Sequence, residues 1–264
     1  MSKNQTPSEA STQFLLRMYL WLQIWCHVFS GLLILFLCFP FIGQEAKNRH
    51  IKNWSVRLLG IFRIRLRVIG EAILPATPIL LASNHISWMD IHAINAFKPI
   101  RFVAKSDVAA WPIFGWMAKQ LGTVFIKRDS ARHGKQVASE VSRVLKNDSV
   151  CIFPEGTSTV GDGVLPFRPN LFESAVIAQA PVFSLAITYK SIETGLRSVA
   201  PAFIGDMGLL ESMANILRSP GLIVELTFLP PSGASPSASS DRKWLALHSQ
   251  EAISALLKGN QPPM

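Results

Sequence analysis

The sequence predicts an α/β protein with a mostly parallel sheet flanked by helices, preceded by an N-terminal membrane-associated helical segment. From residue 77 onward, short apolar runs alternate with helix-like segments, which is typical of a parallel sheet. Between Arg17 and Glu45 there is no Asp, Glu, Lys or Arg, and about 20 apolar residues are enough to cross a bilayer core. The mean hydropathy of +0.28 is high for a soluble enzyme.

The chain is expected to have three parts. Residues 1–12 are polar and predict a disordered tail. Residues 13–69 predict a membrane-anchoring helical segment with a basic interfacial stretch, and both a single tilted span and a helical hairpin within one leaflet fit this composition. Residues 70–264 form the predicted catalytic domain. The basic stretch contains Lys47, Arg49, Lys52, Arg57, Arg63, Arg65 and Arg67.

The formal net charge of +9 predicts an acidic partner, which could be nucleic acid, anionic lipid or an acidic carrier protein. The basic residues lie beside the membrane segment rather than among stacking aromatic residues, which favours a membrane surface and argues against nucleic acid. By the positive-inside rule, the catalytic part is expected on the cytoplasmic face of the cell inner membrane. The three cysteines are far apart and predict neither a disulfide framework nor a zinc site.

The apolar runs are the predicted strands, and they are bounded by turn residues and helix-like segments. They are Ile79–Ser83, Arg101–Lys105, Thr123–Lys127, Ser149–Pro154, Val182–Tyr189 and Leu222–Leu229. Between two of them, residues 129–148 place Val137, Val141, Val144 and Leu145 on one helical stripe. A last helix is expected to begin near Asp241.

The stretch SNHISWMD, residues 83–90, places His85 and Asp90 directly after a predicted buried strand. On one continuous helix these side chains would point about 140° apart. If His85 precedes the helix and Asp90 lies in its first turn, the carboxylate can reach the imidazole, and Ser87 with Asp90 resembles a capping box. A structural role for Asp90 at the helix start is one reading. A histidine oriented by a carboxylate that removes a proton from a hydroxyl is the other.

A second polar group follows another predicted strand. The stretch IFPEGTST, residues 152–159, combines a glutamate, a tight-turn glycine and three hydroxyls, and TVFIKR ends on Lys127 and Arg128. Loops at the carboxyl ends of strands in an open α/β sheet are where ligands bind. These stretches therefore predict one site together with His85 and Asp90.

The order N-H-x-x-x-x-D, G-x-x-F-I-x-R, F-P-E-G-T and Pro181-Val182 resembles the lysophospholipid acyltransferase family, which includes bacterial 1-acylglycerol-3-phosphate acyltransferases. The resemblance covers about residues 70 to 230 and implies a glycerolipid acyltransferase-like fold for the domain at 70–264. It implies His85 as general base and Asp90 as the carboxylate that orients it. The implied acceptor-binding residues are Arg128, Glu155, Gly156 and Thr157. It also implies no metal, no cofactor and no covalent acyl-enzyme, with acyl-CoA or acyl carrier protein as donor.

One position departs from the family. Phosphatidate-forming members usually continue F-P-E-G-T with Arg-Ser, whereas this chain has Ser158-Thr159. Lys105, Lys127, Arg128 or Arg168 could supply the missing charge. We therefore expect 1-acylglycerol-3-phosphate as the acceptor, with lyso-ornithine lipid as the alternative, because the stretch FPEGTSTVGDGVLPFRPNLFESA also resembles enzymes that acylate that lipid.

Two readings from other classes compete with this one. The chain could be a catalytically inactive membrane-attached interaction module, although a scaffold needs no His, Asp and Glu at strand ends. A metal hydrolase would use His85, Asp90, His92 and Glu155, but three well-placed ligands are not evident from the spacing.

Overall fold

A single sheet of seven strands organises the chain, in the order β1-β7-β6-β2-β5-β3-β4. The computed structural model describes residues 7–126, 131–219, 221–232 and 241–259. The strands are β1 (Ile64–Ile69), β2 (Leu80–Ser83), β3 (Arg101–Lys105), β4 (Val124–Ile126), β5 (Val150–Ile152), β6 (Val182–Ser191) and β7 (Leu222–Ser232). Neighbouring strands are parallel except β6 and β7. The predicted mostly parallel sheet is confirmed.

The six predicted strands correspond to β2 through β7, but the sequence analysis missed β1. Residues 64–69 were assigned to the basic interfacial stretch, and they instead pair in parallel with β7. The alternation of IRLRVI explains the difference, because a strand places successive side chains on opposite faces. Ile64 is buried, whereas Arg65 and Arg67 are exposed on the other face. The sheet therefore begins before residue 70.

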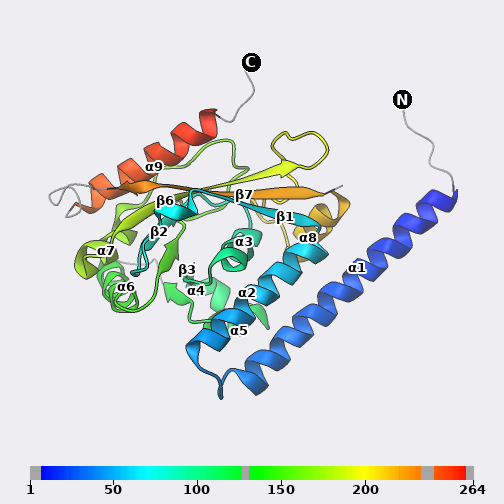
Figure 1. Cartoon of the computed structure of the whole chain (residues 1–264), viewed down its shortest axis with the longest axis horizontal. Helices are drawn as coiled ribbons and strands as arrows, with labels where there is room; N and C mark the ends of the chain where they lie inside the picture. The colour runs from blue at the N-terminus through cyan, green and yellow to red at the C-terminus, as the bar shows by residue number, and fades with distance from the viewer. Residues whose placement is uncertain (1–6, 127–130, 220, 233–240, 260–264) are drawn as a thin grey trace.

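Helices cover both faces of the sheet (Figure 1). Helices α6 (Ala131–Val144), α7 (Glu173–Ala178) and α9 (Arg242–Gly259) share one hydrophobic core with the sheet. Helices α2 (Gln44–Ile61), α3 (Met89–Phe97) and α8 (Leu209–Arg218) share the other. The remaining helices are α1 (Pro7–Leu33), the π-helix η1 (Ile34–Cys38), α4 (Ser106–Ala109), α5 (Phe114–Gln120) and the 3-10 helices η2 (Glu71–Ile73) and η3 (Pro169–Leu171).

The predicted helix over residues 129–148 is α6 in its described part, and the predicted last helix is α9. The predicted disordered tail differs from the structure, because α1 already begins at Pro7 and includes residues 7–12. Residues 1–6 lie outside the described residues.

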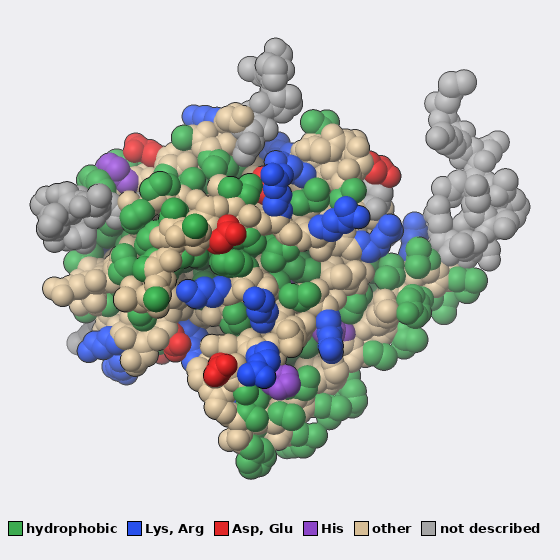
Figure 2. Space-filling model, viewed as in Figure 1, with side chains coloured by type: hydrophobic (Ala, Val, Ile, Leu, Met, Phe, Trp, Pro, Cys, Tyr) green, Lys and Arg blue, Asp and Glu red, His purple; other side chains and the backbone are tan. Residues whose placement is uncertain are grey.

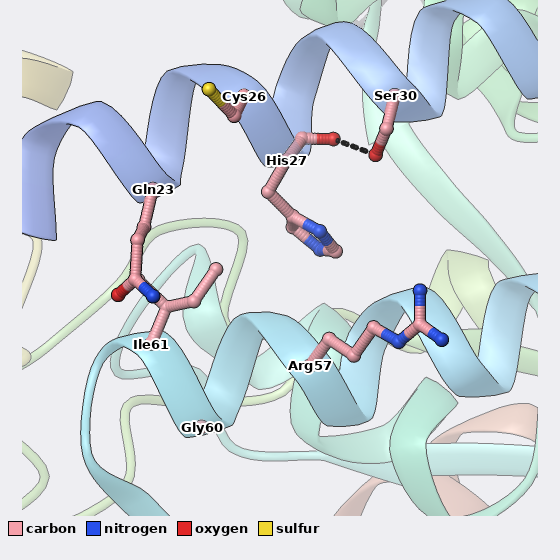
Figure 3. Close-up of a pocket in the computed structure, with 7 residues that line it drawn as sticks. All are labelled: Gln23, Cys26, His27, Ser30, Arg57, Gly60 and Ile61. Atoms are coloured by element: carbon pink, nitrogen blue, oxygen red, sulfur yellow. Dashed lines mark hydrogen bonds between the residues drawn. The ribbon is translucent and has the colours of Figure 1, made fainter.

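Helix α1 lies beside α2. Together with η1 it forms an apolar helical stretch, Leu15–Cys38, that is long enough to cross a membrane by length and composition. Figure 2 shows hydrophobic side chains along α1 and Lys and Arg side chains over α2. The two helices are joined through His27, which points from α1 toward α2 (Figure 3). His27 Nε2 donates to the Trp54 carbonyl oxygen at 2.9 Å, and Trp54 Nε1 donates to the His27 carbonyl oxygen at 3.2 Å.

Trp54 also connects α2 to α3. The ring of His92 on α3 lies 5.3 Å from the Trp54 ring and 5.8 Å from the Trp88 ring, measured between centroids. Burial, together with a smaller effect of the nearby His27, lowers the pKa of His92 to about 4. The neutral imidazole is therefore the form that the packing accommodates.

We expect the free energy of unfolding to fall as the pH drops from about 6.5 toward 4. In this window the unfolded chain binds a proton at His92 and the folded protein does not, so acidification favours unfolding. Denaturant titrations at several pH values would measure this. The variant His92→Phe keeps a ring at this position and removes the titrating group, so its stability should depend less on pH. Equal pH dependence in both proteins would contradict the assignment.

Candidate active site

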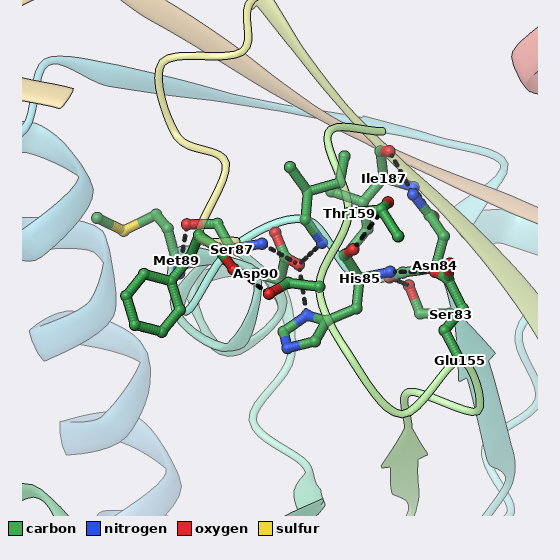
Figure 4. A network of polar contacts seen from close by, with 12 residues as sticks. Ser83, Asn84, His85, Ser87, Met89, Asp90, Glu155, Thr159 and Ile187 are labelled. Atoms are coloured by element: carbon green, nitrogen blue, oxygen red, sulfur yellow. Dashed lines mark hydrogen bonds and ion pairs between the residues drawn. The ribbon is translucent and has the colours of Figure 1, made fainter. Parts of the chain in front are cut away.

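The site forms where β2, β5 and β6 end on the same edge of the sheet. The loop after β2 carries His85, the loop after β5 carries Glu155 and Thr159, and β6 itself carries Tyr189 near its end. Figure 4 shows the side chains from the first two loops converging beside the start of α3. Parallel strands bring their carboxyl ends together, which is why residues distant in the sequence meet here.

Asp90 is the centre of the polar network. Its side chain is fully buried, and its Oδ2 accepts hydrogen bonds from His85 Nδ1 at 2.9 Å, the Ile86 N–H at 2.8 Å and the Ser87 N–H at 2.9 Å. Its Oδ1 accepts one from the Tyr189 hydroxyl at 2.7 Å. An ionised carboxylate has about four acceptor positions, and this one accepts four hydrogen bonds, three at Oδ2 and one at Oδ1. The network stabilises a buried charge that would otherwise be costly.

The start of α3 places Asp90 within reach of the imidazole. Ser87 Oγ accepts the Met89 N–H at 3.2 Å, while the Asp90 carboxylate accepts the Ser87 N–H. This pattern resembles a capping box, except that the Ser87 hydroxyl accepts the N–H of Met89 and not that of Asp90. His85 precedes the helix and Asp90 lies in its first turn. This is the arrangement in which the sequence analysis expected the two side chains to meet.

His85 is held in one tautomer and is open to solvent. An ionised carboxylate only accepts, so the proton of the pair sits on Nδ1, and Nε2 is the nitrogen available to a substrate. The His85 side chain is 21% exposed, whereas Asp90 is not exposed. The Phe153 ring stacks on the imidazole with centroids 4.0 Å apart and an interplanar angle of 18°. The imidazole therefore has a fixed orientation. One of its faces is covered by Phe153, and part of the ring remains exposed to solvent.

The loop of residues 153–159 clamps the peptide of His85 from both sides. Glu155 Oε1 accepts the His85 N–H at 2.8 Å, and its Oε2 accepts the Leu165 N–H at 2.9 Å. The His85 carbonyl oxygen accepts the Thr159 N–H at 2.9 Å and the Thr159 hydroxyl at 3.3 Å. Burial raises the pKa of Glu155, although the two N–H groups lower it. Both carboxylate oxygens of Glu155 thus accept hydrogen bonds from backbone N–H groups and are not directed at a ligand.

The other predicted substrate-binding residues are dispersed. Gly156 is buried, whereas Thr157 and Arg168 are exposed near the same loop, with the Arg168 N–H donating to the Pro154 carbonyl oxygen. Lys105 is the last residue of β3, but its side chain is not among the described ones. Arg128 and Lys127 lie outside the described residues.

Sequence reasoning missed three residues of this network. Tyr189 is one of two tyrosines in the chain and ends a predicted strand, a position that could have marked it. Thr159 belongs to the pair that departs from the family pattern, and it clamps His85. Asn84, next to His85, bonds the Ile187 peptide through Nδ2 at 3.0 Å and Oδ1 at 2.8 Å, which ties the end of β2 to β6.

Replacing Tyr189 by phenylalanine is expected to lower the free energy of unfolding by about 1–3 kcal/mol, the usual cost of leaving a buried polar group unpaired. Asp90 Oδ1 would lose the donor it has in the structure. Burial and the neighbouring Asp90 raise the pKa of Tyr189, so its hydroxyl stays protonated and able to donate. Denaturant unfolding measures the effect, with Tyr19→Phe on the exposed face of α1 as the control. Equal stability of Tyr189→Phe and the wild type would contradict this role.

Comparisons with known proteins support the same protein family as the sequence motifs. The acyltransferase family model matches residues 65–188. The lyso-ornithine lipid O-acyltransferase of Pseudomonas aeruginosa is 36% identical over 220 residues, covering 82% of this chain and 81% of that protein. The chain belongs to the lysophospholipid acyltransferase family. It is an O-acyltransferase, as the sequence predicted.

Another relative of the acyltransferase and a similar solved structure are named for a second acceptor lipid. The 1-acyl-sn-glycerol-3-phosphate acyltransferase of Neisseria meningitidis is 34% identical over 214 residues, covering 81% of this chain and 82% of that protein. The crystal structure of the 1-acyl-sn-glycerophosphate acyltransferase PlsC of Thermotoga maritima has a TM-score of 0.69 to this chain, with 97% and 98% of the two chains covered. At 20% sequence identity it supports the fold of the acyltransferase alone.

The metal-hydrolase reading finds no support in the arrangement of its residues. Within the ranges that the structure describes, no three His, Cys, Asp or Glu side chains form a group that could hold a metal ion. His92 contacts the Trp54 and Trp88 rings, and Glu155 binds backbone N–H groups.

Proposed function

We propose that the acyltransferase moves a fatty acyl chain from acyl-CoA or acyl carrier protein to the free hydroxyl of a lysolipid, with His85 as general base. One observation carries the proposal: Nδ1 of His85 is bonded to a buried carboxylate, which leaves Nε2 of a partly exposed ring to act on a hydroxyl. A positioned base of this kind contributes about 10²- to 10⁴-fold to a rate.

The reaction then follows from this geometry. Nε2 of His85 takes the hydroxyl proton while the lipid oxygen attacks the thioester carbonyl carbon. A C–O bond forms, the C–S bond breaks, and the imidazolium returns its proton to the departing thiolate. Asp90 stabilises the transient positive charge on the ring without accepting the proton. The products are a two-chain lipid and a free thiol.

The acceptor is proposed to bind beside the loop after β5. Thr157 and Arg168 are exposed there and available to a headgroup, and Gly156, Lys105 and Arg128 remain part of the proposed acceptor site. Glu155 we assign differently from the sequence analysis. Its two oxygens bond to the His85 and Leu165 N–H groups, so we propose that it positions the base.

The first candidate acceptor is 1-acylglycerol-3-phosphate, which gives phosphatidate. The basic side chains proposed for the site would complement its phosphate, because Arg and Lys bind phosphate through charge-assisted hydrogen bonds. The Neisseria meningitidis relative, which is 34% identical to this chain over 214 residues, is named for this acceptor.

The second candidate, lyso-ornithine lipid, is favoured by a specific observation. Ser158 stands where the phosphatidate-forming enzymes usually have an arginine, and its hydroxyl donates to the Phe203 carbonyl oxygen rather than facing open space. A guanidinium that would clamp phosphate is thus replaced by a group engaged with backbone. The Pseudomonas aeruginosa relative is named for this acceptor.

Membrane docking is proposed through α1, η1 and the α4–α5 segment on the cytoplasmic face of the inner membrane. Helix α1 buries one side against the rest of the protein, through Ile24 and Val28, and exposes the other. This supports insertion into one leaflet rather than a lone span. The exposed apolar side chains include Leu22, Trp25, Phe29, Phe36, Leu37, Phe41, Trp111, Ile113 and Trp116. The basic side chains of α2 would contact anionic headgroups.

The decisive experiment supplies purified protein with a labelled acyl donor and, in parallel, 1-acylglycerol-3-phosphate and lyso-ornithine lipid. Formation of a labelled two-chain lipid from one of them, measured by thin-layer chromatography, identifies the acceptor. Running each acceptor with acyl-CoA and with acyl carrier protein identifies the donor. Absence of product in all four combinations would refute the proposed function.

A further inference from the structure

A groove lies between α1 and α2, and none of its lining residues takes part in the His85 network. It has a volume of about 530 Å³. Figure 3 shows its lining residues on the two helices. They are Gln23, Cys26, His27 and Ser30 from α1, and Arg57, Gly60 and Ile61 from α2.

The α1 side of the groove is a polar stripe in an otherwise apolar helix. Gln23, His27 and Ser30 follow one another at intervals of four and three residues, which places them on one face of a helix. This face is turned toward α2 (Figure 3). Polar side chains in an apolar membrane-associated helix are costly, and where they occur they usually serve a site.

The α2 side supplies a positive charge without an acidic partner. Arg57 is exposed, and it takes part in no ion pair within the described part of the chain. By contrast, Arg49 on the same helix faces Glu45 at 3.7 Å. A guanidinium presents a planar set of donors that matches phosphate in two-point contact. The groove thus combines a cation that has no acidic partner among the described residues with two polar side chains that bond within α1. Ser30 Oγ donates to the His27 carbonyl oxygen at 2.8 Å, and Gln23 Nε2 donates to the Tyr19 hydroxyl at 3.0 Å.

Space for a ligand is provided by Gly60, one turn beyond Arg57. A Cβ added at Gly60 would have no atom within 4 Å, so the groove is open at this point. On α1, the apolar side chains of Leu22, Trp25 and Phe29 are exposed. A ligand that used both surfaces would need an anionic head and an apolar chain.

We propose that this groove binds the phosphate group of an anionic phospholipid, at a site separate from the one that holds His85. Arg57 contacts the phosphate, and the Gln23 amide lies beside it, while the acyl chains lie along the exposed face of α1. The inference rests on the proposed membrane docking of the enzyme. Such a site would fix the depth and rotation of the α1–α2 pair in an anionic membrane.

The test measures binding of short-chain phosphatidylglycerol, short-chain phosphatidylcholine and inorganic phosphate to the full-length enzyme by native mass spectrometry. We expect phosphatidylglycerol to bind about tenfold more tightly than phosphatidylcholine, and inorganic phosphate to bind more weakly than phosphatidylglycerol. Gly60→Leu fills the groove without changing charge, and Arg57→Lys keeps the charge without the planar donor set. Each should remove most of the preference for phosphatidylglycerol, whereas the matched control Arg49→Lys should keep it.

Four outcomes would overturn the inference. Unchanged preference in both Gly60→Leu and Arg57→Lys would mean that the lipid binds elsewhere. An equal loss in Arg49→Lys would mean diffuse attraction by the basic helix. Inorganic phosphate binding as tightly as the lipid would make the site one for free phosphate. Acyl transfer by the wild-type protein in detergent is measured alongside, so an active enzyme without lipid preference refutes this inference alone.

Discussion

Replacing His85 by alanine is expected to reduce acyl transfer by about 10²- to 10⁴-fold, the range for loss of a positioned general base. The substitution removes the imidazole that the structure orients for proton removal, with Nδ1 hydrogen-bonded to Asp90 at 2.9 Å. Because the loss lies in the chemical step, kcat should fall while the apparent affinity for the acceptor changes little. Initial rates with a labelled acyl donor and the identified lysolipid measure it.

The control for this variant is His50→Ala, which removes an exposed imidazole from α2 and should leave the rate unchanged. Circular dichroism and the unfolding midpoint check that His85→Ala still folds. Asp90→Asn provides a second test, because an amide can donate to Nδ1 and so stabilise the wrong tautomer. If the folded His85→Ala protein kept wild-type activity, the proposed mechanism would be wrong.

Replacing Glu155 by glutamine is expected to lower both stability and kcat. The two carboxylate oxygens accept the N–H groups of His85 and Leu165 at 2.8 and 2.9 Å. Glutamine offers a single acceptor oxygen and turns an N–H₂ toward one of these donors. An unpaired buried N–H costs about 1–3 kcal/mol, and release of the His85 peptide displaces the base. Denaturant unfolding and steady-state kinetics measure the two effects.

This variant also separates the two roles considered for Glu155. If the residue binds the acceptor, as the family resemblance implies, Glu155→Gln should raise KM and leave the unfolding free energy near that of the wild type. If it positions His85, kcat and stability should fall together. The matched control is Glu173→Gln, which breaks the half-exposed ion pair with Arg242 and is expected to cost at most about 1 kcal/mol.

Local sequence patterns were sufficient to predict those features that depend on residues close together in the sequence. The strands β2 to β7 appeared in the sequence as apolar runs because both faces of the sheet are covered by helices, so side chains on both faces are buried. The pairing of His85 with Asp90 was predicted for the case in which a helix begins between them, and the structure has this arrangement. The strand β1 was missed because its alternating arginines share their composition with an interfacial membrane segment.

Residue types, order and short spacings thus determined the fold class, the family, the proximity of His85 to Asp90 and the apolar N-terminal helix of this protein. Only the tertiary structure decided that Tyr189 bonds Asp90 across 99 residues, that Glu155 holds the His85 peptide across 70 residues, and that β1 pairs with β7. The physical reason is that these contacts depend on strand order and register. A hydrogen bond between distant segments leaves no periodic trace in either segment, so it becomes visible only once the sheet has brought their ends together.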